Sequence, residues 1–94
     1  MAKFTDDDRG YLHWIMENPD GFVVNVGRGE RPGYAVLHRS SCSSISSHRE
    51  DGAYTARGYK KVVSDDIIKL REYVRSIGRV DGSFSKQCGR CQPT

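Results

Sequence analysis

The sequence contains no apolar run long enough to cross a bilayer, and its first residues lack a basic segment that leads into an apolar stretch. It has only three cysteines, an odd number that would leave one thiol unpaired in a disulfide framework. These absences predict a cytoplasmic protein without a membrane segment, in a compartment where thiols stay reduced. Only 36% of the 94 residues are hydrophobic, so a single domain spanning residues 1–94 must have a thin core.

Signatures of catalysis are missing as well. The sequence has no G-x-S-x-G nucleophile motif, and Gly27-Arg28-Gly29 falls between two expected strands rather than between a strand and a helix. Asp65 and Asp66 are better explained as the acidic start of a helix than as an acid/base pair. The chain is therefore expected to be non-catalytic.

Apolar spacing and turn residues predict the secondary structure. A helix is expected to begin at the Thr5 cap, which is followed by three aspartates, and to end near Glu17. Residues 22–26 and 34–38 are expected to form a hairpin, and residues 58–63 a third strand. A second helix should open at Ser64 and stop at Gly78, because residues 67, 70, 74 and 77 form one apolar stripe.

The serine-rich stretch from residue 39 to residue 58 reads as a loop with room for one helical turn, and residues 79–94 read as irregular. The expected fold is α+β: a small, mostly antiparallel three-stranded sheet with two helices and a C-terminal zinc-binding loop.

Two pairs of metal-ligand residues predict a zinc site. His38 and Cys42 are spaced H-x3-C, and Cys88 and Cys91 form a C-x2-C pair near the end of the sequence. Four such ligands match the tetrahedral preference of a structural zinc ion. His48 is an alternative to His38 as the fourth ligand, but a residue at the end of a strand should be held more rigidly.

The thiols also allow two metal-free hypotheses. Cys88 and Cys91 could be a redox-active dithiol, although such pairs normally lie at a strand-to-helix junction. Cys42 could be a nucleophile with His38 as its base, provided that both residues are free of metal.

Positive charge is concentrated after the first 20 residues, which hold two basic and five acidic side chains although the net charge of the chain is +3. A basic surface with interleaved tyrosines, such as Tyr54 and Tyr59, fits a nucleic-acid partner. The same charges would be ordinary in a domain that binds a protein partner. The candidate nucleic-acid-binding residues are Arg28, Arg31, Arg39, Arg57, Lys60, Lys61 and Arg90.

Four segments together resemble a group of short, functionally uncharacterised bacterial zinc-binding proteins. They are Asn18-Pro19-Asp20-Gly21-Phe22-Val23-Val24-Asn25, His38-Arg39-Ser40-Ser41-Cys42, Gly58-Tyr59-Lys60-Lys61-Val62 and Cys88-Gly89-Arg90-Cys91-Gln92-Pro93. Members of that group often carry a cysteine where this chain has Val63. Some stand beside nuclease or DNA-modification modules, so the resemblance implies a zinc domain and favours a link to DNA restriction or defence.

The sequence thus predicts a zinc-stabilised domain that binds DNA or another nucleic acid. A zinc-stabilised protein-interaction or regulatory subunit is the alternative, and an enzyme or redox dithiol the third.

Overall fold

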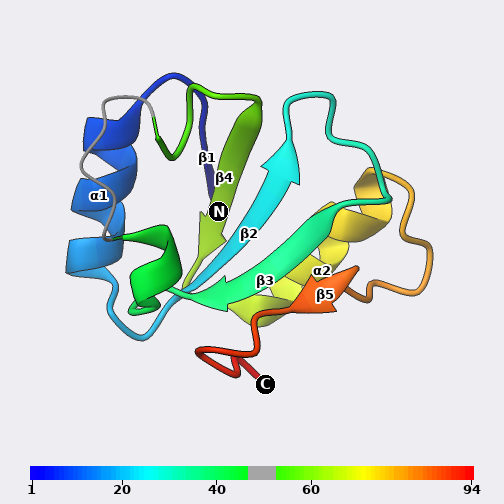
Figure 1. The fold of residues 1–94 in the computed structure, drawn as a ribbon. Coiled ribbons are helices and arrows are strands. Elements are labelled where there is room, and N and C mark those ends of the chain that lie inside the picture. Colours follow the sequence, from blue (N-terminus) through cyan, green and yellow to red (C-terminus); the bar gives the residue numbers. More distant parts are fainter. Residues whose placement is uncertain (47–52) are drawn as a thin grey trace.

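A computed structural model of the chain describes residues 1–46 and 53–94. Its central feature is one twisted sheet in the order β1-β4-β2-β3-β5, with two helices packed against it (Figure 1). Three of the four strand pairings are antiparallel, and the pairing of β3 with β5 is parallel. The strands are β1 (Ala2–Phe4), β2 (Phe22–Gly27), β3 (Ala35–Arg39), β4 (Tyr59–Ser64) and β5 (Lys86–Gln87).

The α+β class is confirmed, but the expected count of three strands is wrong. The structure adds β1 at one edge of the sheet and β5 at the other. Both strands were missed because they are only three and two residues long, too short to show an alternating pattern. β5 is nevertheless held firmly in register, since the N–H of Ser85 donates to Ala35 O and that of Cys88 to Leu37 O, both at 2.9 Å.

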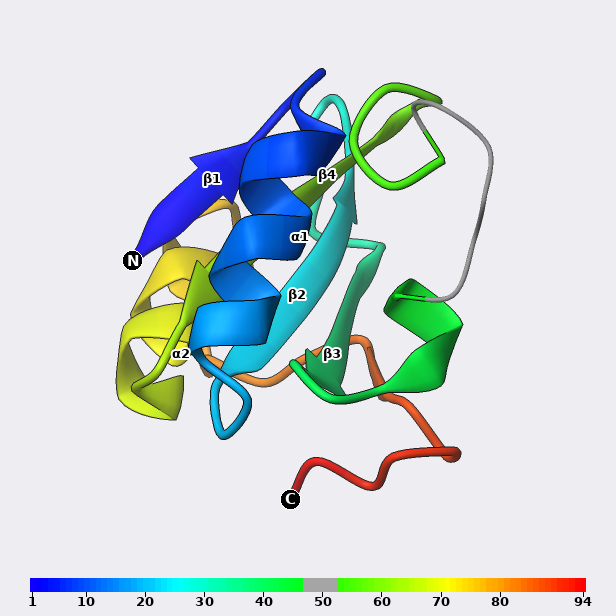
Figure 2. The same ribbon diagram turned by 90° about the vertical axis from the view of Figure 1, so that its left-hand side faces the viewer.

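The two helices, α1 (Asp8–Glu17) and α2 (Ile67–Ser76), cover opposite faces of the sheet (Figure 2). Successive side chains of a strand point to opposite faces, so each strand supplies both cores. Val24 packs with Leu70 under α2, whereas Val23 packs with Tyr11 under α1. The chain therefore forms a layer of sheet between two small hydrophobic cores.

Both helices begin later than the sequence suggested. The side chain of Asp7, rather than Thr5, caps α1 by accepting a hydrogen bond from the N–H of Gly10. Asp66, rather than Ser64, caps α2 by accepting from the N–H of Ile68. In each case an aspartate nearer the helix takes the capping position, because its carboxylate reaches the free N–H groups of the first turn.

The predicted helical turn in the serine loop is present as the 3-10 helix η1 (Ser43–Ile45). The buried hydroxyl of Tyr11 donates to Ile45 O at 2.8 Å and so attaches η1 to α1. The segment after residue 52 is attached to the same helix, since the Asp8 carboxylate accepts from the N–H of Thr55 at 2.8 Å. In the described parts of the chain, neither helix is long and apolar enough to span a membrane.

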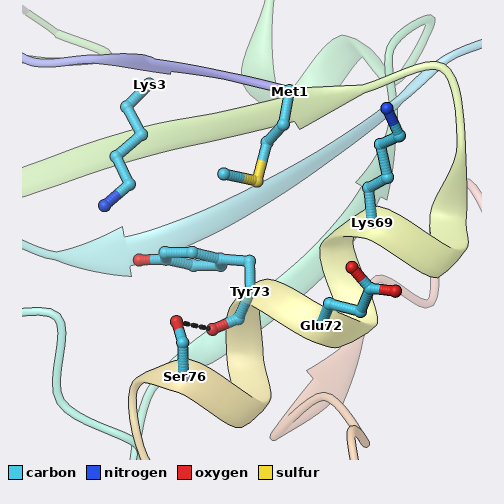
Figure 3. A pocket seen from close by; sticks show the side chains of 6 residues that line it. All are labelled: Met1, Lys3, Lys69, Glu72, Tyr73 and Ser76. Atoms are coloured by element: carbon cyan, nitrogen blue, oxygen red, sulfur yellow. Dashed lines mark hydrogen bonds between the residues drawn. The ribbon is translucent and has the colours of Figure 1, made fainter.

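On the α2 side, a hollow of about 450 Å³ lies between β1 and the helix (Figure 3). Beside it, the Glu30 carboxylate accepts hydrogen bonds from the Tyr73 hydroxyl at 2.6 Å, from Lys3 Nζ at 2.9 Å and from Lys60 Nζ at 3.1 Å. These bonds, that of Tyr73 foremost, lower the pKa of Glu30 to about 2. Glu30 thus ties the β2–β3 connection to β1, β4 and α2.

This carboxylate should make stability depend on acid. Because its pKa is lower in the folded chain than in the unfolded one, its contribution is complete above about pH 4.5 and is lost as the pH falls towards 2. We expect Glu30→Gln to lower the free energy of unfolding by about 1–2 kcal/mol at pH 7, reduced from a fully buried value because the side chain is 22% exposed.

The measurement is urea unfolding of parent and variant at a series of pH values. The difference between them should shrink as the pH falls below 4.5. Glu72→Gln, which removes the same charge from an exposed position of α2, is the matched control. A gap between Glu30→Gln and the parent that is the same at every pH would contradict the role of the carboxylate charge.

Candidate metal centre

The four residues predicted as metal ligands come together at the end of β3. His38 lies within β3, Cys42 directly precedes η1, and Cys88 and Cys91 lie in the turn that follows β5. One ligand atom of each residue lies within 4.8 Å of the others. The parallel pairing of β5 with β3 places the C-x2-C turn at this point. Cys42 and Cys88, which are 46 positions apart in the sequence, therefore share one site.

The spacing of the ligand atoms fits a tetrahedral metal ion. The sulfur atoms of Cys42 and Cys88 are 3.9 Å apart, too far for a disulfide bond, and all three cysteines are free thiols. Two thiolates that bind one zinc ion, each at about 2.3 Å and at a tetrahedral angle, would lie roughly 3.8 Å apart. His38, Cys42, Cys88 and Cys91 could therefore bind a metal with little rearrangement.

Neighbouring groups hold the ligands in place. The backbone N–H of Arg39 points to the sulfur of Cys91 at 3.3 Å, and the Ser44 hydroxyl lies 3.0 Å from the sulfur of Cys42. The N–H of Gln92 donates to Cys88 O and closes the C-x2-C turn. Hydrogen bonds of this kind orient the ligands and stabilise thiolate charge.

The protonation of two of the ligands, His38 and Cys88, also suits a metal, whereas burial raises the pKa of Cys91 to about 11. Burial, helped by the positive charge of Lys61, lowers the pKa of His38 to about 4, so its imidazole is neutral at pH 7 and can bind an ion. Burial alone would raise the pKa of Cys88, but hydrogen bonds from the N–H groups of Cys91 and Arg90 lower it. One thiol of the C-x2-C pair is thereby prepared to ionise.

Two of the basic residues predicted to bind nucleic acid support this centre instead of projecting freely. Arg39 Nε donates to Cys91 O at 3.0 Å and Arg39 Nη2 to Gln92 O at 3.1 Å. Arg90 Nη1 lies 3.4 Å from the Ser43 hydroxyl. Arg39 thus fastens the last turn of the chain to the end of β3.

The other five basic residues lie elsewhere. Arg28 directly follows β2, at the end of the sheet opposite Arg39, which pairs with Phe22. The six residues of β2 separate these ends by about 20 Å. Arg28 forms an ion pair with Asp6, and Lys60 pairs with Glu30 at 3.1 Å. Arg31 and Arg57 are exposed in the neighbouring connections, while Lys61 is buried within β4.

The alternative ligand His48 lies outside the described residues. Position 63, where the resembling proteins often have cysteine, lies on β4, separated from β3 by β2. Val63 is fully buried in the α1-side core. Two strand spacings of about 4.8 Å put its Cα roughly 10 Å from that of His38, too far to share one ion without rearrangement.

Comparisons of the chain with protein-family models, with curated proteins and with solved structures find no match. The resemblance to bacterial zinc-binding proteins therefore stays a prediction, and the function must be inferred from the site itself.

A polar pair on the α1-side face of the sheet was missed at the sequence level, although one of its members, Lys61, was among the candidate basic residues. Asn25 interrupts the apolar run of β2, and Lys61 occupies the opposite position on β4. Each stands on the face of the sheet that also carries Val23 and Val63, where alternation predicts an apolar side chain. The available signal was a polar residue at an inward position of a strand. It indicates a polar pair only once the strand register is known to place Asn25 opposite Lys61.

Proposed function

We propose that this chain is a non-catalytic domain that is stabilised by one structural zinc ion and binds nucleic acid. The observation that carries the zinc assignment is the cluster of three sulfurs and one imidazole within 4.8 Å. Cys₃His is a ligand set of structural zinc sites, whereas iron–sulfur clusters generally take four cysteines.

A set of four protein ligands leaves no position for water or substrate on the ion, which argues for a structural role. The nucleophile hypothesis fits less well. Cys42 is only 3% exposed and its sulfur lies 3.9 Å from that of Cys88, so a substrate would have little access to it.

Nucleic-acid binding is supported by an exposed pair of aromatic rings near basic side chains. The rings of Tyr34 and Tyr59 lie 5.6 Å apart and the two residues are 43% and 42% exposed. The exposed Arg31 lies three residues before Tyr34, and the exposed Arg57 two residues before Tyr59. Stacking surfaces bordered by positive charge are typical of proteins that bind single-stranded nucleic acid.

The test combines metal analysis with a binding titration on protein purified without a metal-affinity tag. We expect one zinc ion per chain. A labelled single-stranded oligonucleotide, followed by fluorescence anisotropy, should bind with an affinity that falls as salt rises. Arg31→Ala should weaken binding at every sequence and lower the slope of log K against log salt by about 1.

Arg9→Ala is the matched control, because it removes the same charge from an exposed position on α1. It should leave the slope nearly unchanged. Equal effects of the two substitutions would point to non-specific attraction by net charge. Absence of any binding would overturn the nucleic-acid assignment and favour a protein partner, while absence of zinc would overturn the structural role of the centre.

A further inference from the structure

One row of side chains crosses the α1-side face of the sheet and is unusually polar for an interior surface. The strand register sets Phe4 opposite Lys61, Lys61 opposite Asn25, Asn25 opposite Val36, and Val36 opposite Lys86. Residues paired in this way point to the same face. Two adjoining hollows of about 380 and 240 Å³ open over this row, and both are lined by Asn25 and Tyr34.

Lys61 is the unusual group in this row. The residue is 4% exposed, yet the two hydrogen bonds the structure describes for its Nζ, both of 2.7 Å, go to the neutral oxygens Asn25 Oδ1 and Tyr54 O. An ammonium group has three donors, of which these oxygens take two, and Nζ also lies 5.9 Å from the centre of the Tyr11 ring. Lys61 lines the smaller of the two hollows, where its ammonium group can meet a ligand. Burial lowers the pKa of Lys61 to about 8, which still leaves the side chain largely protonated at pH 7.

The other polar groups of the hollows also offer hydrogen-bond donors. Asn25 Oδ1 is occupied by Lys61, so the amide presents its NH₂ group, which lies 3.4 Å from the Tyr34 hydroxyl. Lys86 lines the larger hollow, next to Ser44 and Gly89. None of the described residues that line either hollow is acidic. A ligand that accepts hydrogen bonds and carries negative charge would fit this composition.

The residues that line the two hollows suggest different parts of such a ligand. Three tyrosines (Tyr34, Tyr54 and Tyr59) line the smaller one together with Asn25 and Lys61, which suits a planar aromatic ring with an acceptor edge. The larger one extends along Lys86 towards the metal centre and suits a sugar and phosphate.

We infer that these hollows bind one unpaired nucleotide, with its base among the tyrosines and its phosphate beside Lys86. Because Asn25 and Lys61 present donors, the site favours bases with a carbonyl edge, such as thymine, uracil or guanine, over adenine with its amino group. The inference rests on the proposed function, and it makes the zinc centre one wall of the hollow that holds the sugar and phosphate. The nucleotide can come from a single strand or be a free mononucleotide.

The experiment compares labelled oligo(dT) and oligo(dA) of about 12 nucleotides, a length that covers a typical single-strand site. Parent protein should prefer oligo(dT) by about tenfold, and excess duplex of mixed sequence should compete poorly. Lys61→Met keeps the length of the side chain but removes its donors. We expect this variant to lose the preference by binding oligo(dT) about tenfold more weakly while binding oligo(dA) as before.

Lys86→Ala is a second variant at an exposed position, where folding is not at risk. It should weaken both oligonucleotides equally, because the phosphate carries no sequence information. Circular dichroism and zinc content establish that each variant is folded.

A folded Lys61→Met that binds both strands like the parent would overturn the site while leaving nucleic-acid binding intact. If the parent binds no oligonucleotide, the proposed function fails, and titration with thymidine monophosphate decides the site separately. Binding that Lys61→Met weakens would then support a mononucleotide site, and no binding would overturn it.

Discussion

Cys88→Ser is expected to release the zinc ion and to unfold most molecules at room temperature. Structural zinc contributes about 10–16 kcal/mol of binding free energy in small metal-dependent domains, whereas the whole stability of a domain is about 5–15 kcal/mol. Serine is a poor zinc ligand, and the remaining three residues would hold the ion far more weakly. We therefore expect a loss of at least about 5 kcal/mol, which equals the lower end of this stability range and is enough to unfold a small domain.

The position of the metal centre explains why loss of the ion should destabilise the rest of the domain. Cys42 belongs to the buried cluster under α1, and Cys88 and Cys91 pack against the same cluster. Beyond β5, the chain contacts the sheet through the C-x2-C turn and Arg39. Without the metal, the variant would keep two sulfurs and a serine hydroxyl crowded at the edge of a core, and the pairing of β5 with β3 would lose its anchor.

The measurement is zinc content together with thermal unfolding of parent and variant. Ser44→Ala is the matched control, since it removes a hydroxyl that lies 3.0 Å from Cys42 Sγ but keeps all four ligands. It should retain the zinc and lose no more than about 1 kcal/mol. Cys88→His, which restores a zinc ligand, should recover part of the metal content. A parent protein whose unfolding temperature is unchanged by a chelator would contradict the prediction.

The parts of the structure that depend on patterns among neighbouring residues could be predicted from the sequence. The apolar stripe of α2 and the alternation in β2, β3 and β4 are local patterns, and they placed these elements to within a few residues. The cluster of His38, Cys42, Cys88 and Cys91 could be predicted too, because coordination chemistry restricts the residue types and C-x2-C fixes two of them. The capping residues were misplaced by two positions each, since several adjacent polar residues can cap a helix equally well.

The features that depend on distant partners could not be predicted. Lys60 and Glu30 pair over 30 residues of sequence, and Arg28 pairs with Asp6 over 22. Charge counts therefore overstated the number of basic side chains available to a phosphate. β5 has no pattern of its own and forms where the segment before the C-x2-C turn meets β3. Asn25 and Lys61 meet only through the strand register, which the sequence does not specify.

Leu70→Ala tests the second core, which lies on the face of the sheet away from the cluster of Cys42, Cys88 and Cys91. Leu70, on the inner face of α2, is fully buried and packs in one cluster with Val24, Val62 and Val74. Truncating it removes three carbons from a closely packed site and leaves a cavity, which costs about 3–5 kcal/mol. Thermal or urea unfolding of the zinc-loaded protein measures the loss. Ile68→Ala, at a 60% exposed position on the same helix, is the control and should change stability by less than about 0.5 kcal/mol.

The decisive comparison is between the effect of Leu70→Ala on stability and the effect of removing zinc. The sheet separates Leu70 from the centre, so the folded fraction of Leu70→Ala should still bind one zinc ion per chain, and its unfolding temperature should still fall when a chelator is added. If the two cores contribute independently, the effects of the substitution and of zinc removal should add within about 0.5 kcal/mol. Loss of zinc from folded Leu70→Ala would show instead that packing under α2 shapes the ligand cluster through β3, and that the two sides of the sheet act as one unit.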